Sequence, residues 1–192
     1  GRHAAALRER GLPAKTCVNL TPSTLYDAAF LDHLRSKIAE GALRPEDLLI
    51  EITEQTSLLF TGESSALLKS YRALGFRLVI DDFSMGHTSL KYLQDNEFDM
   101  VKLDGALVRD LTNPRSREII VSIVSLAEAL RFAVLAEYVE TEDVRRRLEN
   151  IGVTLYQGYL YSPALPFERF ATFVEARAGA RPEDGPASGR RL

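Results

Sequence analysis

The sequence is poor in features that define several common protein classes. Cys17 is the single cysteine among 192 residues, which excludes an internal disulfide framework and fits a reducing compartment. No apolar run approaches the roughly 20 residues that a membrane-spanning helix needs, and no signal peptide opens the chain. The net charge of −3 gives no overall attraction to nucleic acid or to an anionic membrane. We therefore expect a cytoplasmic protein, which a longer parent protein could still link to a membrane.

Glycine-rich phosphate loops and familiar nucleophile arrangements are also missing. No GxGxxG or GxxxxGK[ST] segment occurs, so an open dinucleotide-binding fold is disfavoured. No Ser-His-Asp or Cys-His arrangement is visible. What the chain does have is 45% apolar residues, which is enough for one sizeable core. The 27% of charged residues argues against a fully disordered chain.

Strands and helices are predicted to alternate along the chain. Apolar runs predict strands at 15–20, 48–53, 77–83, 99–104, 133–139 and 154–160. Helical spacing predicts helices at 2–10, 26–40, 64–74, 88–96, 114–132, 142–152 and 166–178, with Asn113 and Thr141 as N-caps. Strict alternation implies a parallel sheet with helices outside. We expect strand 15–20 to be buried, Cys17 to pack in the core, and residues 1–178 to form one domain before a disordered tail at 179–192.

Nearly every predicted strand carries a polar residue near its C-terminal end. These residues are Asn19, Glu51, Asp81, Asp82, Lys102, Asp104, Glu137 and Gln157. On successive parallel strands, such residues converge on one face of a barrel. A closed (β/α)₈ barrel takes about 250 residues, and about 200 at the least, which exceeds this chain. The predicted fold class is therefore α/β, with the parallel strands arranged as a TIM-like barrel for which the chain is short.

The converging carboxylates predict a site for hard divalent cations. Several carboxylates buried together are costly unless a cation compensates, and oxygen ligands suit Mg²⁺ or Mn²⁺. Two such ions are a common apparatus for phosphodiester displacement. Each residue also has a plain interpretation when taken alone: Glu51 as a solvated strand end, Asp81 and Asp82 as cap and loop charges, Lys102 as a partner of Asp104 or Asp81. The site prediction depends on their occurring together.

The order of these segments resembles the EAL domain family of bacterial cyclic di-GMP phosphodiesterases. The resemblance is carried by VNLTP (18–22), LLIEITE (48–54), VIDDFSMGHTSL (79–90), VKLDGALV (101–108), VLAEYVET (134–141) and YQGYLYSPALP (156–166). It implies that Asn19, Glu51 and Asp81 bind one divalent metal, and that Asp82 and Glu137 hold the second metal and its water. It further implies that Lys102 positions the attacking water, Gln157 supports the site, and Glu54 anchors the loop after Asp82 and links activity to dimerisation.

The chain also departs from the family pattern. No Glu-Ala-Leu signature stands before Asn19, so we expect an N-terminally truncated domain that lacks the signature strand. The resemblance implies a barrel of eight strands, so with six predicted strands we expect an incomplete TIM-like barrel. Ser84 replaces a glycine, His87 a tyrosine, and Tyr138 a glycine beside Glu137, where the ring would crowd the mouth of the site.

The resemblance leaves alternative functions open. The leading hypothesis is hydrolysis of cyclic di-GMP to linear pGpG with two Mg²⁺ or Mn²⁺ ions, in a homodimer or behind upstream sensory or GGDEF-type domains, without any nucleic-acid polymer as partner. One alternative is a degenerate domain that acts as a cyclic di-GMP receptor or protein-interaction module. Another is a different metal-dependent barrel of the enolase type.

Overall fold

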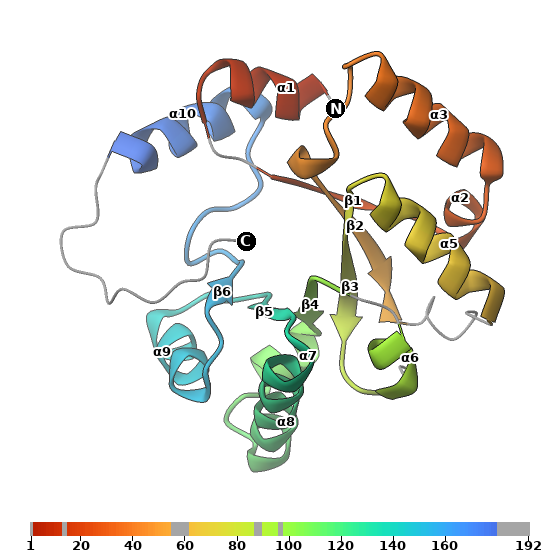
Figure 1. Ribbon diagram of the computed structural model, residues 1–192. Coiled ribbons are helices and arrows are strands. Elements are labelled where there is room, and N and C mark those ends of the chain that lie inside the picture. The colour runs from red at the N-terminus through yellow and green to blue at the C-terminus, as the bar shows by residue number, and fades with distance from the viewer. Residues whose placement is uncertain (1, 13–14, 55–61, 87–89, 96–97, 180–192) are drawn as a thin grey trace.

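The computed structural model describes residues 2–12, 15–54, 62–86, 90–95 and 98–179. Its centre is a six-stranded parallel sheet whose spatial order, β1-β2-β3-β4-β5-β6, equals the order along the chain. The strands are β1 (Thr16–Asn19), β2 (Leu48–Thr53), β3 (Arg77–Phe83), β4 (Met100–Leu103), β5 (Ala133–Ala136) and β6 (Leu155–Tyr156). The sheet curls into part of a barrel (Figure 1), so the predicted incomplete TIM-like barrel is confirmed.

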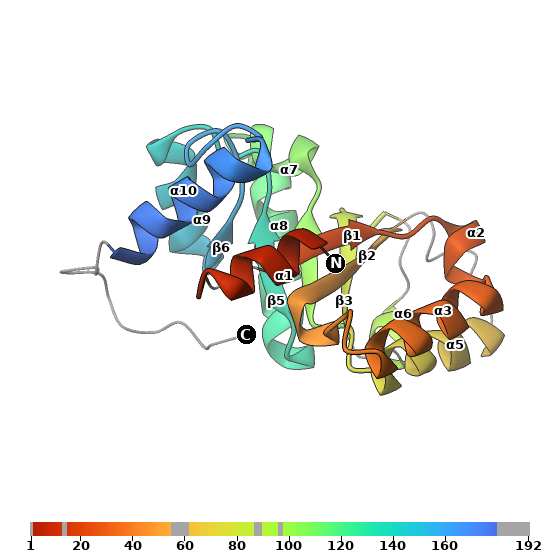
Figure 2. The same cartoon turned by 90° about the horizontal axis from the view of Figure 1, so that it is seen from above.

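Helices surround the curled sheet on its outer side, as the two perpendicular views show (Figures 1 and 2). They are α1 (Arg2–Glu9), α2 (Pro22–Leu25), α3 (Ala28–Ala39), α5 (Gly62–Ala73), α6 (Leu90–Asp95), α7 (Gly105–Arg109), α8 (Pro114–Leu130), α9 (Glu142–Ile151) and α10 (Phe167–Gly179), with a 3₁₀ turn at Pro45–Asp47. The predicted caps are confirmed: the Asn113 side chain accepts a hydrogen bond from the Arg115 N–H, and Thr141 accepts one from the Val144 N–H. Among the described residues, no helix is long and apolar enough to cross a membrane.

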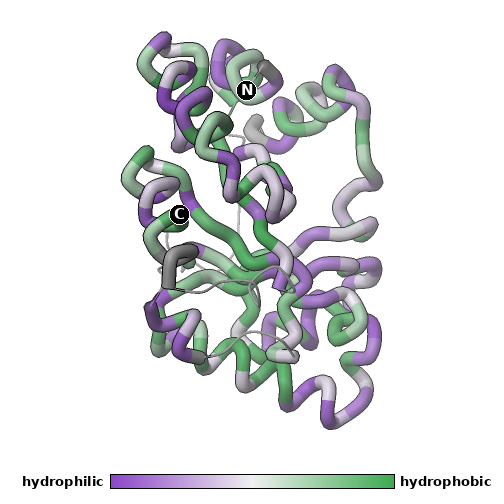
Figure 3. Tube along the Cα trace, turned by 90° about the vertical axis from the view of Figure 1, so that its right-hand side faces the viewer, coloured by the Kyte–Doolittle hydropathy of each residue, from purple (hydrophilic) through white to green (hydrophobic). Residues whose placement is uncertain are grey.

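The alternation of side chains along each strand divides the core into two parts. The larger part lies between the sheet and the helices and includes Ile50, Ile80 and Val134. A smaller cluster lies on the inner face of the curl and is built from Leu49, Val79 and Met100, with partly buried residues of β5 and β6 beside them. Apolar residues accordingly concentrate along the strands, while polar ones concentrate on the outer helices (Figure 3). Residues that continue the inner face toward the strand ends form the site described below.

The expectation that the first strand is buried is wrong. Cys17, Val18 and Asn19 are all exposed, and so is the cysteine that we expected in the core. The reason is topological: within the described part of the chain, β1 is an edge strand that pairs with β2 alone. An apolar run can indicate a strand without indicating whether both of its faces are covered.

The first and last helices lie side by side, although they are far apart in sequence (Figures 1 and 2). The His3 ring stacks on Phe167, with centroids 4.4 Å apart and planes 15° apart. Arg10 Nη2 donates to Glu168 Oε2 at 2.9 Å. The α1–α10 contact therefore bridges the gap between the two ends of the curled sheet, where β1 and β6 themselves are not paired with each other.

Candidate metal centre

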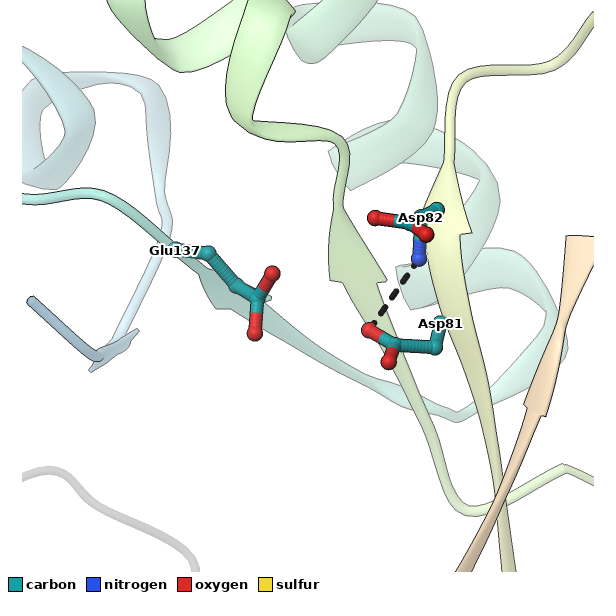
Figure 4. A group of neighbouring side chains, drawn as sticks. All are labelled: Asp81, Asp82 and Glu137. Atoms are coloured by element: carbon teal, nitrogen blue, oxygen red, sulfur yellow. Dashed lines mark hydrogen bonds between the residues drawn. The ribbon is translucent and has the colours of Figure 1, made fainter. Parts of the chain in front are cut away.

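Three carboxylates meet at the C-terminal ends of β3 and β5. Asp81, Asp82 and Glu137 each offer an oxygen, and these oxygens all lie within 4.8 Å of one another (Figure 4). Successive side chains of a regular strand point to opposite faces, so two adjacent aspartates would normally diverge. Here the register of β3 against β4 shifts between Ile80 and Phe83, and Asp82 has a left-handed φ of 54°. This irregularity turns Asp82 toward the same side as Asp81.

Lys102 lies at the centre of the carboxylates. It comes from β4, the strand between β3 and β5, and its side chain is only 7% exposed. Its Nζ atom lies 2.7 Å from Glu137 Oε1, 3.0 Å from Asp81 Oδ1 and 3.2 Å from Glu51 Oε1. Burial alone would lower the pKa of Lys102, but the hydrogen bond to Glu137 and the charges of Glu51 and Asp81 outweigh it and raise this pKa. The ammonium group is therefore charged at neutral pH.

One ammonium does not balance four carboxylates. Burial raises the pKa of Asp82, and the charges of Asp81 and Asp104 add to this. Burial also raises the pKa of Glu137, although Lys102 acts in the opposite direction. Glu51 Oε1 is buried and lies 3.2 Å from Lys102 Nζ, but among the described residues it receives no hydrogen bond of acceptable geometry. Excess negative charge and a buried carboxylate oxygen without a well-aligned hydrogen bond fit a hard divalent cation bound to oxygen ligands.

Asn19 and Gln157 lie at the periphery of the cluster. Asn19 stands opposite Glu51 in the register of β1 and β2, so both belong to the same face of the sheet, but Asn19 is exposed on the edge strand. Gln157 is also exposed and lines a pocket of about 310 Å³ together with Glu137. Asp104, weighed above as a partner of Lys102, instead caps α7 by accepting a hydrogen bond from the Ala106 N–H at 2.6 Å.

Glu54 holds the loop that follows β3. Its side chain is 1% exposed, and Oε2 accepts hydrogen bonds from the N–H and the hydroxyl of Ser84, both at 2.9 Å. A glycine at position 84 would provide only the first of these bonds, so Ser84 adds a contact between this loop and the site. His87 lies outside the described residues.

The sequence interpretation overlooked Arg109, the last residue of α7. Its guanidinium carbon lies 4.4 Å from the centroid of the Tyr138 ring. Tyr138 lines the pocket beside Glu137 and is 51% exposed. No motif in the sequence indicates this pairing, because the two residues belong to different strand–helix units.

The raised pKa of Asp82 predicts how Asp82→Asn changes stability with pH. A carboxyl whose pKa is higher in the folded state favours folding below its ordinary value and loses this contribution as pH rises through the raised value. Asparagine tolerates a left-handed φ and does not titrate. Relative to the unaltered chain in EDTA, the variant should gain stability as the pH rises above the ordinary aspartate pKa, as measured by urea denaturation. A pH-independent difference would contradict the raised pKa.

The fold and the site together define a class of protein, an incomplete parallel β/α barrel with a lysine-centred carboxylate cluster at its strand ends. The comparisons with known proteins give the family. The model of the EAL domain matches residues 2–164, and the chain belongs to the EAL domain family.

Two relatives found by sequence are named as cyclic di-GMP phosphodiesterases. The chain is 33% identical over 168 residues to cyclic di-GMP phosphodiesterase RocR of Pseudomonas aeruginosa, covering 87% of this chain and 43% of the relative. It is 31% identical over 157 residues to cyclic di-GMP phosphodiesterase PdeF of Escherichia coli, covering 81% of this chain and 21% of the relative. The chain thus spans less than half the length of either curated relative.

Solved structures show the same fold. A PaMucR phosphodiesterase in complex with c-di-GMP has a TM-score of 0.80 and 28% identity, covering 88% of this chain and 76% of the other. The EAL domain of Mycobacterium smegmatis DcpA has a TM-score of 0.83 and 25% identity, covering 91% and 79%. Klebsiella pneumoniae BlrP1 in a manganese and c-di-GMP complex has a TM-score of 0.74 and 32% identity, covering 84% and 42%.

Proposed function

We propose that this chain, as an EAL domain over residues 1–178, takes part in hydrolysis of cyclic di-GMP to linear pGpG. The observation that carries the proposal is the carboxylate cluster around Lys102 at the strand ends. It is supported by the similar protein RocR, which is named as a cyclic di-GMP phosphodiesterase. In the reaction, the oxygen of water bonds to phosphorus and the bond from phosphorus to one ribose 3′ oxygen breaks. The released oxygen takes up a proton, and the other phosphodiester stays intact.

Divalent ions, Mg²⁺ or Mn²⁺, would supply charge to the phosphate and acidity to the water when bound. Asn19, Glu51 and Asp81 would hold one ion, and Asp82 and Glu137 the other. The acidic donor set supports hard cations, and a manganese complex and a calcium complex of BlrP1 are among the similar structures.

The remaining residues of the site position the reactants. The Lys102 ammonium, fixed by three carboxylates, would orient the attacking water and stabilise charge that develops on the phosphate. Gln157 would support the same region from the pocket beside Glu137. Glu54 would keep the loop after β3 in place through Ser84, and in the active protein would couple this loop to a homodimer. Upstream sensory or GGDEF-type domains of a longer parent protein would supply regulation.

Turnover by the purified chain tests the proposal. We expect linear pGpG to form from cyclic di-GMP with Mn²⁺ or Mg²⁺, and Asp81→Asn to reduce the rate by at least about 100-fold, more than the loss typical of a supporting residue around a metal. EDTA should abolish the reaction. Asp32→Asn, which removes one charge from an exposed pair with Arg35, is the matched control and should keep the full rate.

Two outcomes would overturn the proposed activity. One is that the unaltered chain forms no more linear pGpG than Asp81→Asn does with either Mg²⁺ or Mn²⁺. The other is binding of cyclic di-GMP in EDTA without turnover in any metal, which would assign the chain a receptor function instead.

A further inference from the structure

Tyr138 occupies a backbone conformation that a tyrosine rarely adopts. Its φ is 53°, in the left-handed region that glycine tolerates and other residues avoid. The ring gains little burial in exchange, because the residue is 51% exposed. A strained residue at the rim of a candidate site is a reason to ask what its side chain contacts.

One side of the Tyr138 ring rests on α7. Gly105 and Arg109 are four residues apart on this helix and therefore share a face. A Cβ atom at Gly105 would lie 2.2 Å from Cδ2 of Tyr138, so the ring is in close contact with the helix backbone. The Arg109 guanidinium lies over the same ring, 4.4 Å from its centroid. Helix α7 therefore fixes the orientation of the ring.

A pocket lies beside the candidate metal centre. Tyr138 lines this pocket of about 310 Å³ with Glu137, Gln157 and Tyr159, a volume at the lower end of small-molecule sites. Glu137 belongs both to this pocket and to the carboxylate cluster. A ligand whose phosphate lies at the cluster therefore has this pocket as its neighbour.

We propose that Tyr138 is a stacking surface for one guanine base of the dinucleotide, an inference that rests on the proposed function. A purine is planar and stacks on an exposed aromatic ring, and a ring fixed beforehand by Gly105 and Arg109 loses little freedom when the base binds. On this proposal, the tyrosine that the sequence places at the mouth of the site forms one wall of the pocket.

Variants at position 138 separate stacking from simple packing. Tyr138→Phe and Tyr138→Leu both keep an apolar side chain at the strained backbone position, but only the first keeps the ring. By calorimetry with cyclic di-GMP and Ca²⁺, we expect Phe to bind within about 2-fold of the unaltered chain and Leu about 10-fold more weakly. With Mn²⁺, the Leu variant should show a raised KM and a nearly unchanged kcat, because the ring contributes equally to ground-state and transition-state binding.

Tyr138→Gly adds a second readout. It relieves the left-handed strain and removes the ring, so we expect a higher melting temperature together with weaker binding. A residue with only a structural role would not move these quantities in opposite directions.

The outcomes distinguish this inference from the proposed function. If Tyr138→Leu does not weaken binding of cyclic di-GMP, or if Tyr138→Gly strengthens it, the stacking role of Tyr138 is overturned and the proposed hydrolysis is unaffected. If Tyr138→Leu weakens binding of cyclic di-GMP but the unaltered chain shows no turnover, the stacking role is supported and the proposed hydrolysis is overturned. No binding of cyclic di-GMP to the unaltered chain with Ca²⁺ or Mn²⁺ overturns both.

Discussion

Replacing Lys102 with methionine should lower the free energy of unfolding by about 3–5 kcal/mol at neutral pH in EDTA, which is typical when one partner of a buried ion pair is removed. The lysine side chain is 7% exposed, and it is the cation that contacts Glu51, Asp81 and Glu137. Methionine fills a similar volume without charge. Three largely buried carboxylates would then lose their counter-charge and repel one another. Urea denaturation measures the loss, and turnover should fall with it.

Neutral pH is the right condition for this measurement. A lysine whose pKa is raised in the folded state contributes its full stabilisation below the ordinary lysine pKa and loses it as pH rises through the raised value. The pKa of Lys102 is raised, so the whole contribution is present at pH 7 and disappears only in strongly alkaline solution.

Lys37→Met is the matched control for Lys102→Met. Lys37 Nζ also pairs with a carboxylate, Glu40 Oε2 at 2.6 Å, but this side chain is 41% exposed. An exposed pair contributes about 0–1 kcal/mol, so the control should be nearly neutral. Divalent ions should restore part of the stability of Lys102→Met and little of Lys37→Met. Equal losses in the two variants, or no response to ions, would contradict a charge-balanced site.

Replacing Gly158 with alanine should cost about 3 kcal/mol of stability, at the upper end of what overpacking costs, and most of the activity. A Cβ atom at this position would lie 2.3 Å from the carbonyl oxygen and 2.4 Å from the nitrogen of Val139. Both neighbours are backbone atoms, so rotation of a side chain cannot relieve the overlap. The same two segments are joined by hydrogen bonds from Val139 N–H to the Gln157 carbonyl and from Leu160 N–H to the Val139 carbonyl, each 3.0 Å.

We expect activity to be lost because the close approach of Gly158 to Val139 lies next to two residues of the candidate site. Gln157 precedes Gly158, and Glu137 lies two residues before Val139, so separating the two segments displaces both sides of the pocket at once. Gly41→Ala is the control, because Gly41 has a left-handed φ of 71° but nothing within 4 Å of an added Cβ. The control should lose about 1 kcal/mol from backbone strain and keep its activity. A similar loss of stability and activity in both variants would show that strain, and not the overlap, decides the effect.

The strand–helix order was predictable because it depends on local patterns. The strands 48–53 and 77–83 agree with β2 and β3, since apolar runs between turn signals are visible in a few residues of sequence. The short helices α2 and α7 were missed. Each spans four or five residues after a capping residue, Thr21 or Asp104, and so short a segment shows no helical period.

The candidate site was predictable where strand parity decides it. Glu51 and Lys102 lie on the inner face, as alternation along their strands requires, and both are buried. The sequence did not predict how residues from different strand–helix units are placed relative to one another. The left-handed turn at Asp82 and the contact of Tyr138 with Arg109 depend on backbone conformations that form only when strands from different units pair. The exposure of Asn19 depends on its strand lying at the sheet edge.

The contact between α1 and α10 has a consequence for the order of folding. Each strand pairs with the next strand in sequence, and paired residues are 20 to 33 positions apart. Closing loops of this length has a modest entropic cost. Arg10 and Glu168 are 158 residues apart, and their exposed ion pair is worth at most about 1 kcal/mol. The ion pair alone is too weak to close so long a loop in a disordered chain, so we expect the contact between α1 and α10 to form after the sheet has aligned its two ends. We then expect the contact between α1 and α10 to separate more readily than the paired strands when the folded protein fluctuates.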